Sequence, residues 1–378
     1  MKVKLGDVCT IQSGGTPSRT KPDYWENGQI PWVKISDIKS KYVDKTEECI
    51  TKLGLKNSSA KIFPSGTILY TIFATLGETC VLNIDATTNQ AIAGIAIKDN
   101  NIISDYLYYY LLSRKNSVQT MGRGVAQNNI NLKMLKDFEI PLPPLDEQRR
   151  IAAVLDKVSD LITKRREQLR KLDELVKARF VEMFGDPSAN SHWSTHKLSE
   201  LGELNRGISK HRPRNDPKLL GGPYPLIQTG DVSNSGLYIQ NYSATYSEFG
   251  LAQSRLWKKG TLCITIAANI AQTSILAFDA CFPDSVVGFL PGEKTNVVFV
   301  HYWFSFFQKI LEEQAPQVAQ KNINLKILSD LDVIVPPYHL QADFSNFVGQ
   351  IENCKLTIQH SLDTIETLKK ALMQEYFG

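Results

Sequence analysis

The chain has 378 residues, of which 42% are hydrophobic and 22% charged, with 17 prolines. These values are typical of a folded protein and exclude disordered, collagen-like and low-complexity chains, and at about 150 residues per domain the length predicts two or three domains. No apolar run approaches the ~18 residues of a membrane span, and the N-terminus lacks the apolar core of a signal peptide. We therefore expect a cytoplasmic protein with no membrane partner. The six cysteines form no CxxC pair and no zinc-like spacing with histidine, so we expect reduced, buried thiols.

The net charge of +4 does not by itself indicate a nucleic-acid partner, but its distribution is uneven. Residues 1–185 carry 27 Lys and Arg against 21 Asp and Glu, a balance of +6, whereas the remaining residues carry 16 against 18, a balance of −2. The positive charge of the second part is concentrated in RGISKHRPRNDPK, residues 206–218, where Gly and Pro oppose a long helix. This stretch predicts a basic loop.

The same sequence pattern occurs twice in the chain, and the second copy is displaced from the first by 193 residues. AQNNINLKMLKDFEIPLPPL from Ala126 aligns with AQKNINLKILSDLDVIVPPY from Ala319, and 11 of the 20 positions are identical. KLGDV at Lys4 likewise matches KLSEL at Lys197. A repeat of this length indicates a duplicated architecture, with one copy in residues 1–185 and the other in the rest.

Each copy begins with about 140 residues of mixed character. Short β-branched and aromatic runs predict strands, at 67–73 and 91–97 in the first copy and at 261–267 in the second. The aromatic-rich segments 106–114 and 299–314 are predicted to be helices. Their aromatic side chains favour core packing over base stacking, because contiguous aromatics on a helix usually fill a core. Each copy should therefore form an α+β globule.

A long helix should follow each globule, after Pro143-Pro144 and after Pro336-Pro337. Apolar residues there step by four and three, which is typical of a coiled-coil seam, and about 38 residues give a rod of roughly 57 Å. We expect the two helices to pack antiparallel around a pseudo-twofold axis; one long core helix in each copy is the alternative. The predicted seam residues are Ile151, Leu155, Val158, Ile162, Leu169, Leu172, Ile351, Ile358, Leu362, Ile365 and Leu372.

Four basic residues interrupt the seam. When the two copies are aligned at the shift of 193 residues, each of them aligns with an apolar residue of the other helix. They are Arg165 and Arg179 in the first helix and Lys355 and Lys369 in the second. A charged seam residue can fix register, but a long basic side chain can also carry its charge out to water. Both interpretations are open.

Catalytic motifs of the phosphate-loop, dinucleotide, zincin and serine-hydrolase types are absent from the sequence. Pro22-Asp23 with Asp37-Ile38-Lys39 fits a magnesium nuclease spacing, but the repeat keeps only the second aspartate, as Asp231, which favours a role in a turn or at a strand end. Val335-Pro336-Pro337-Tyr338 resembles an amino-methyltransferase motif, yet valine cannot accept the hydrogen bond that the motif needs. We interpret this segment as the stop before a helix.

Polar loops are the remaining candidates for function. SGGTPSRTK at 13–21 stands where RGISKHRPR stands in the second copy, and GRGVAQNN at 122–129 stands where APQVAQKN stands. A shared framework with divergent loops fits two domains that contact different ligands, and these side chains bond phosphates and base edges. The candidate DNA-contacting residues are Ser13, Thr16, Ser18, Arg19, Lys21, Arg123, Gln127, Asn128, Arg206, Lys210, Arg212, Arg214, Gln320 and Lys321.

The duplicated layout, KLGDV with SGGTPS, and the segment NIN…IPLPPLDEQRRIAAVLD together resemble the specificity subunit of type I restriction-modification systems. The resemblance covers the whole chain. It implies target-recognition domains at 1–144 and 186–337 and spacer helices at 145–185 and 338–378. It also implies that each domain recognises one half of a bipartite DNA site, while the helices set the half-site spacing.

The resemblance further implies partners and a division of chemistry. Double-stranded DNA, two modification subunits and the restriction subunits are the implied partners. The chain itself would be non-catalytic and bind no cofactor, and the partner subunits would use S-adenosylmethionine, ATP and Mg²⁺. The second copy has lost PLPPLDEQ, so docking on that side is expected to use other residues. A self-contained nuclease or methyltransferase and a coiled-coil scaffold that does not bind DNA are the rival hypotheses.

Overall fold

The computed structural model describes residues 2–123, 129–187, 192–267, 270–306 and 323–378. The chain divides into two compact units, one formed by Met1–Arg166 with His360–Gly378 and the other by Glu167–Gln359. We call them unit 1 and unit 2. Within the described ranges, no helix combines the length and the apolar character needed to cross a membrane.

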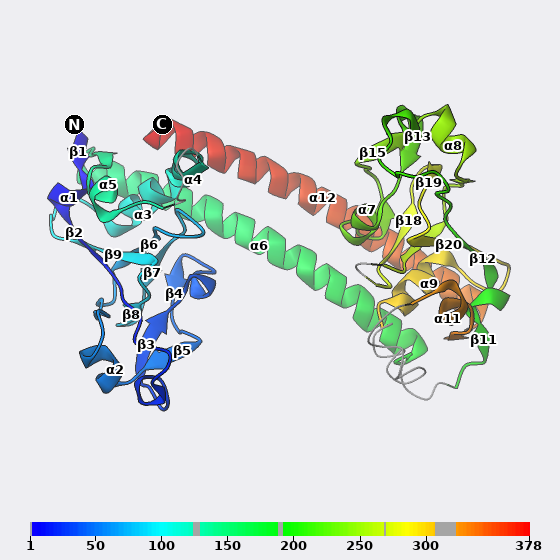
Figure 1. The fold of residues 1–378 in the computed structure, drawn as a ribbon, viewed down its shortest axis with the longest axis horizontal. Helices are drawn as coiled ribbons and strands as arrows, with labels where there is room; N and C mark the ends of the chain where they lie inside the picture. The colour runs from blue at the N-terminus through cyan, green and yellow to red at the C-terminus, as the bar shows by residue number, and fades with distance from the viewer. Residues whose placement is uncertain (1, 124–128, 188–191, 268–269, 307–322) are drawn as a thin grey trace. The chain divides into compact units, whose positions relative to one another are not determined.

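Unit 1 is built on a five-stranded sheet in the order β2-β9-β6-β7-β4, in which only β4 and β7 run parallel (Figure 1). A smaller sheet has the order β5-β3-β8, and β1 pairs with β10. The strands are β1 Lys2–Lys4, β2 Cys9–Ser13, β3 Ile30–Val33, β4 Tyr42–Val43, β5 Glu48–Ile50, β6 Ile68–Thr71, β7 Thr79–Leu82, β8 Thr87–Thr88, β9 Ile92–Ile97 and β10 Glu139–Pro141. The helices are α1 Leu5–Val8, η1 Pro22–Tyr24, η2 Ile35–Asp37, α2 Lys52–Lys56, α3 Ser104–Ser113, α4 Lys115–Arg123 and α5 Leu132–Lys136.

Unit 2 repeats this topology, with the sheet order β12-β20-β17-β18-β14, again parallel only at β14 and β18. Its smaller sheet, β15-β13-β19-β16, has one additional strand, and β11 pairs with β21 as β1 pairs with β10. The strands are β11 Thr195–Lys197, β12 Gly202–Arg206, β13 Leu220–Leu226, β14 Tyr238–Ile239, β15 Ala244–Tyr246, β16 Leu256–Trp257, β17 Leu262–Thr265, β18 Thr273–Leu276, β19 Ala280–Cys281, β20 Val286–Pro291 and β21 Asp332–Ile334. The helices are η3 Leu198–Glu200, η4 Pro217–Leu219, α7 Thr229–Ser233, α8 Glu248–Ala252, α9 Val297–Phe304 and α11 Leu325–Ser329.

The large sheet of unit 1 is buried on both faces. Ile68 and Tyr70 of β6 point to the core shared with α3, whereas Leu69 between them belongs to the core on the opposite face. Because side chains of a strand alternate between faces, a run that is apolar at every position indicates a sheet covered on both sides. The same alternation recurs in β17, where Leu262 and Ile264 face one core and Cys263 the other.

The aromatic helices fill cores, as predicted. Tyr106 and Tyr108 to Tyr110 of α3 are buried, and so are Phe299 and the Tyr302 to Phe304 segment of α9. The second helix was predicted to extend over 299–314; α9 itself ends at Phe304, and residues 307–322 lie outside the described part of the chain.

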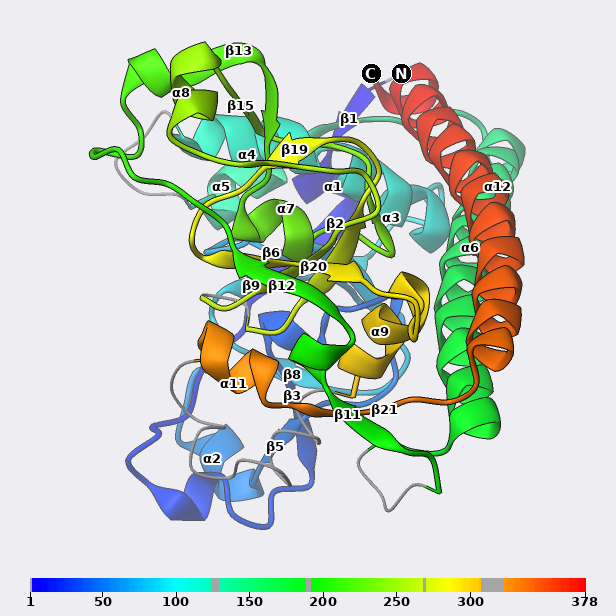
Figure 2. The same ribbon diagram turned by 90° about the vertical axis from the view of Figure 1, so that its right-hand side faces the viewer.

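Two 40-residue helices, α6 Leu145–Phe184 and α12 Tyr338–Phe377, begin directly after the proline pairs. Gly185 follows α6 with a φ of +82°, a left-handed conformation that glycine adopts at helix ends. In unit 1 the first part of α6 packs on the last part of α12, and in unit 2 the last part of α6 packs on the first part of α12 (Figure 2). The pairing is antiparallel in each unit.

The prediction for the cysteines is only partly right. All six are free, and Cys9, Cys80, Cys263 and Cys281 are buried. Cys49 is only partly buried and Cys354 is exposed on α12. Cys354 is not one of the seam positions of α12, which leaves it open to water.

Candidate nucleic-acid interface

The polar loop of unit 1 that follows β2 is held close to the body of the domain. A side chain on Gly14 would place its Cβ 2.0 Å from Thr88 Oγ1, and one on Gly15 would lie 2.3 Å from Ser59 Oγ. Both positions therefore require glycine. The Thr16 hydroxyl then bonds to the side-chain oxygen of Gln90, so the loop starts from a fixed point.

Arg19 lies on two tryptophans. Its guanidinium carbon is 3.6 Å from the ring centre of Trp25 and 4.8 Å from that of Trp32, and its Nη1 is 2.5 Å from Glu48 Oε2. The Trp25 Nε1 donates to the Ser18 carbonyl at 3.0 Å, which fixes the ring under the loop. Cation–π stacking at such a site stabilises by about 0.5–1 kcal/mol. Arg19 is therefore pre-positioned, with its charge shared with Glu48.

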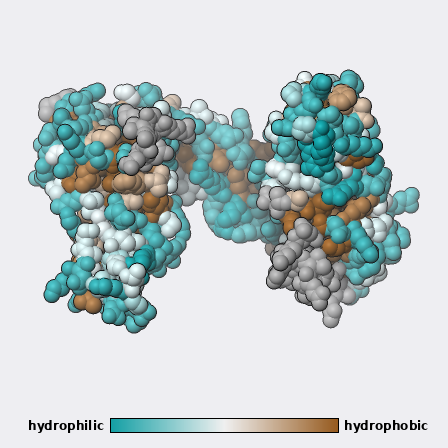
Figure 3. Space-filling view, viewed as in Figure 1, coloured by the Kyte–Doolittle hydropathy of each residue, from teal (hydrophilic) through white to brown (hydrophobic). Residues whose placement is uncertain are grey.

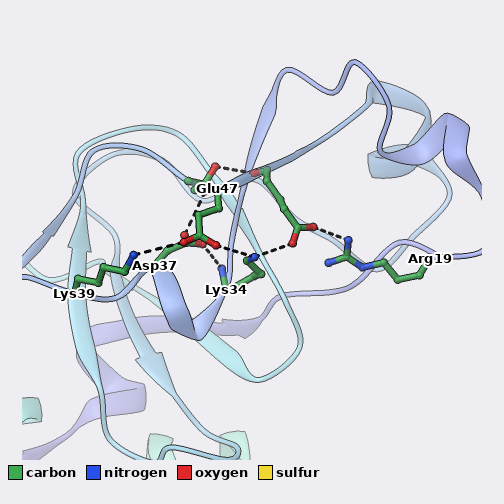
Figure 4. A network of polar contacts seen from close by, with 7 residues as sticks. Arg19, Lys34, Asp37, Lys39 and Glu47 are labelled. Atoms are coloured by element: carbon green, nitrogen blue, oxygen red, sulfur yellow. Dashed lines mark hydrogen bonds and ion pairs between the residues drawn. The ribbon is translucent and has the colours of Figure 1, made fainter. Parts of the chain in front are cut away.

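Glu48 pairs with both Arg19 and Lys34 and so connects this loop to a network of charges, in which Figure 4 labels Lys34, Lys39 and Glu47. Lys34 Nζ lies 2.8 Å from Glu48 and 3.1 Å from Glu47, and Lys39 Nζ is 3.5 Å from Glu47. Hydrogen bonds from Arg19 and Lys34 lower the pKa of Glu48. The network lies beside β3 and β5, in a part of unit 1 whose surface is mostly hydrophilic or neutral in Figure 3.

Asp37, the second aspartate of the nuclease-like spacing, closes a turn in this network. Its two carboxylate oxygens accept the backbone N–H of Lys34 at 2.8 Å and that of Glu47 at 3.3 Å. In unit 2, Asp231 Oδ2 accepts the backbone N–H of Gln228 at 2.7 Å and the hydroxyl of Ser243 at 3.3 Å. Both aspartates therefore have the turn role that the repeat predicts. Among the described residues, no group of three or more His, Cys, Asp or Glu could hold a metal ion.

The basic loop of unit 2 occupies the equivalent position after β12. Gln253 Oε1 accepts the backbone N–H groups of Lys210 at 2.7 Å and His211 at 3.0 Å, which anchors the loop on α8. Arg214 Nη2 lies 2.6 Å from Asp284 Oδ1, and Arg206 Nε donates to the Asp284 carbonyl at 2.5 Å. Apart from the short η4 helix the segment is irregular, which agrees with the predicted loop.

The remaining predicted DNA-contacting residues are distributed as follows. Ser13 ends β2, the Ser18 hydroxyl lies 2.9 Å from that of Thr20, and Lys21 Nζ lies 3.2 Å from Tyr24 Oη. Arg123 is the last residue of α4. Gln127, Asn128, Gln320 and Lys321 lie outside the described residues. Their role in DNA contact stays a prediction.

The predicted seam residues all turn inward to some extent. Ile151, Leu155, Val158, Ile162, Ile351 and Leu362 are buried, and Leu169, Leu172, Ile358, Ile365 and Leu372 are partly buried. In unit 1, Arg166 Nη2 is 2.7 Å from Glu366 Oε1; in unit 2, Lys355 Nζ is 2.9 Å from Asp173 Oδ1. Both pairs join α6 to α12.

Sequence reasoning missed the residues that attach each globule to its helix pair. Gln148 and Gln341, which are equivalent in the repeat, are both fully buried and bond to backbone groups of the globule. In unit 1, Lys41 adds ion pairs to Asp105 at 2.8 Å and Asp156 at 2.6 Å. The identity of Gln148 and Gln341 at a shift of 193 residues was the signal that could have identified that pair.

The comparison with protein families identifies the chain. The model for the type I restriction modification DNA specificity domain matches residues 1–171 and again residues 190–367. The chain therefore belongs to this family, and the two matches correspond to the two copies of the repeat.

Relatives of known name support the same assignment. The chain is 34% identical over 401 residues to the specificity subunit of the type I restriction enzyme MjaIX of Methanocaldococcus jannaschii, covering 98% of this chain and 90% of the relative. It is 29% identical over 398 residues to the EcoprrI specificity subunit of Escherichia coli, covering 97% and 90%.

Solved structures share the fold. The crystal structure of a type I system S subunit from M. genitalium aligns with a TM-score of 0.58 at 15% identity, covering 100% of this chain and 96% of that one. A chain from a structure of type I R-M complex assembly and conformational transition aligns with a TM-score of 0.59 at 18% identity, covering 100% and 97%. The predicted fold class, two tandem α/β domains with two long antiparallel helices, is confirmed.

Proposed function

We propose that this chain is the non-catalytic DNA-recognition subunit of a type I restriction-modification complex, in which each globule reads one half of a bipartite site. The helix pairs set the half-site spacing and carry two modification subunits, and restriction subunits complete the assembly. S-adenosylmethionine, ATP and Mg²⁺ are used by those partners in the cytoplasm, where the complex meets DNA.

One observation carries the proposal: two domains of the same sheet topology present loops of different chemistry at the same place. At equivalent positions before the last long strand of each sheet, the neutral Gln90 contacts Thr16 of the loop after β2, whereas the charged Asp284 pairs with Arg214 of the loop after β12. Recognition of two different half-sites by one scaffold needs variable contact residues, because contacts to base edges carry sequence information that phosphate contacts do not. A scaffold that does not bind DNA has no need for this divergence.

The test is a domain exchange in a host that carries the complete system and lacks other adenine methylation. We expect methylated sites in two short blocks separated by a fixed spacer. Replacing residues 1–144 with the corresponding domain of a relative should change one block and leave the other block and the spacer unchanged. A change in both blocks, or methylation at unrelated sites, would contradict the proposal.

The rival hypothesis, a self-contained nuclease or methyltransferase, is tested separately. The purified chain is incubated with duplex DNA and Mg²⁺, and separately with duplex DNA and S-adenosylmethionine. We expect neither cleavage nor methyl transfer. Product formation that Asp37→Asn abolishes would support a self-contained enzyme.

A further inference from the structure

Three arginines of the basic loop converge on one aspartate. Arg214 Nη2 is 2.6 Å from Asp284 Oδ1, and Arg212 Nη2 lies 3.9 Å from Asp284 Oδ2. Arg206 Nε donates to the backbone carbonyl of the same residue at 2.5 Å. Asp284 precedes β20, about 70 residues from the loop in sequence, so only the fold brings these groups together.

Backbone carbonyls hold the guanidinium groups of Arg206 and Arg212 in place. Arg212 Nη1 donates to the carbonyls of Ser209 at 2.6 Å and His211 at 2.8 Å. The other nearby carboxylate, Asp216, is engaged elsewhere, accepting the Lys218 N–H at 3.0 Å and lying 3.0 Å from His211 Nε2. Asp284 is therefore the carboxylate that the described contacts assign to this cluster.

The cluster is accessible and has an excess of positive charge. The side chains of Arg212 and Arg214 are 55% and 48% exposed, and that of Asp284 is 32% exposed. One carboxylate cannot neutralise three guanidinium groups. Fixed, partly exposed arginines present the paired donors that suit the oxygens of a phosphate, which offers more acceptors than a carboxylate does.

The repeat shows that the acidic residue is not required by the fold. The strand pairs β2·β9 and β12·β20 align Ala93 with Val287, which makes Gln90 the counterpart of Asp284. Gln90 holds the unit 1 loop through the Thr16 hydroxyl without any charge. Asp284 therefore adds a negative charge at a position where the scaffold accepts a neutral amide.

We propose that Arg206, Arg212 and Arg214 form a binding site for one DNA backbone phosphate, and that Asp284 occupies it in the free chain. The incoming phosphate replaces the carboxylate on Arg212 and Arg214, while Arg206 stays bonded to the Asp284 carbonyl. Asp284 thus lowers the affinity of this domain for duplex DNA of any sequence, so that base contacts are needed for tight binding. The inference rests on the proposed function.

The test measures binding of the full chain to a labelled duplex of random sequence by fluorescence anisotropy, from about 50 to 200 mM KCl. Asp284→Asn keeps the shape and the backbone carbonyl but removes the charge, and Asp284→Gln reproduces the unit 1 residue. We expect both to bind about 3- to 5-fold more tightly and to steepen the plot of log affinity against log salt by up to about one.

Two controls separate a local effect from a general gain of positive charge. Asp279→Asn removes an exposed carboxylate of the same unit, one that pairs with Lys258 at 2.9 Å, and should have a smaller effect. In the Arg212→Ala/Arg214→Ala background, Asp284→Asn should have no effect, because its partners are gone. Thermal unfolding checks that each variant is folded.

The outcomes distinguish the inference from the proposed function. Equal gains for Asp284→Asn and Asp279→Asn, or an undiminished gain in the double-arginine background, would overturn the inference and leave the proposed function standing. A wild-type chain that binds no duplex at low salt, alone or with its modification subunits, would overturn both.

Discussion

Gln148 and Gln341 show how a single side chain can fix the junction between a globule and a helix. Gln148 Oε1 accepts the Ile103 N–H at 3.0 Å, and its Nε2 donates to the carbonyls of Asn101 at 2.8 Å and Pro143 at 2.9 Å. Gln341 repeats this with Asn296, Lys294 and Pro336 at 3.0, 3.2 and 2.8 Å. The second copy, expected to have lost the PLPPLDEQ segment, thus keeps its structural glutamine.

Gln148→Leu should destabilise the chain by about 1–3 kcal/mol, because leucine fits the space but leaves three partly buried backbone groups without their partner. The measurement is urea unfolding followed by circular dichroism. Gln350→Leu, on an exposed position of α12, is the matched control and should change the stability by less than about 0.5 kcal/mol. Equal effects of the two substitutions would refute the role of Gln148.

His301 should make unit 2 sensitive to acid. Burial, with a further contribution from the charge of Lys355, lowers its pKa to about 4, and its Nδ1 lies 3.0 Å from Thr273 Oγ1. Above about pH 6.5 the histidine is neutral in both the folded and the unfolded chain. As the pH falls from 6.5 to 4, only the unfolded chain binds the proton, so stability is lost over this range, by roughly 1–3 kcal/mol.

His301→Asn should flatten this part of the stability profile, because asparagine can accept the same hydrogen bond but does not titrate. The free energy of urea unfolding is measured at several pH values between about 4 and 7. His339→Asn, at an exposed position of α12, should leave the slope as in the wild type. An unchanged slope in His301→Asn would show that other groups cause the acid sensitivity.

At the scale of the element, the basic residues that interrupt the helix seam are not equivalent. Lys355 Nζ bonds to Asp173 on α6 at 2.9 Å and to Glu352 at 2.7 Å, and these bonds raise its pKa although burial opposes the charge. Lys369 is also partly buried, but burial and the nearby Arg166 lower its pKa. Arg179 pairs with Glu182 on its own helix. Lys355 is therefore the strongest candidate for a register device; the role of Arg165 stays a prediction.

Replacing each lysine with methionine should separate the two interpretations of the seam. Lys355→Met leaves two carboxylates without their shared partner and should cost about 1 kcal/mol. Lys369→Met removes a charge that its surroundings disfavour and should be neutral or stabilising. The measurement is the free energy of unfolding in urea at pH 7, compared between each variant and the wild type. Equal losses in both variants would mean that the ion pairs of Lys355 contribute nothing specific.

At the scale of the whole molecule, each unit is completed by a helix end from the other copy of the repeat. In unit 1, Phe377 at the end of α12 lies 5.3 Å, between ring centres, from Tyr106 of α3. In unit 2, Phe184 at the end of α6 lies 5.1 Å from Phe299 of α9. Phe184 and Phe377 are equivalent at a shift of 193 residues, and so are Tyr106 and Phe299. Each unit therefore contains the same aromatic contact, with the roles of the two copies exchanged.

The first copy alone, residues 1–185, should therefore form a homodimer. Without α12, the apolar surface around Ile151, Leu155 and Tyr106 is exposed to water. A second copy of the fragment can bury it, because its Phe184 is equivalent to the missing Phe377. Light scattering coupled to size exclusion should give twice the mass of the fragment. Phe184→Asp should abolish the dimer, whereas Val181→Asp, at a position 39% exposed, should not. A folded monomer would contradict the symmetry argument.

The sequence by itself determined the duplication, several of the strands, the position of both long helices and the inward-facing seam. These features follow from the local periodicity of apolar residues and from the repeat at a shift of 193 residues, because they do not depend on contacts between distant residues. Tertiary structure alone decided which charges are available to a ligand. Arg19 and Arg214 look alike in the sequence, but Arg19 stacks on Trp25 and pairs with Glu48, whereas Arg214 pairs with Asp284. The two ion pairs join residues 29 and 70 positions apart, and local sequence does not specify them because a charged side chain finds its partner only after the chain has folded.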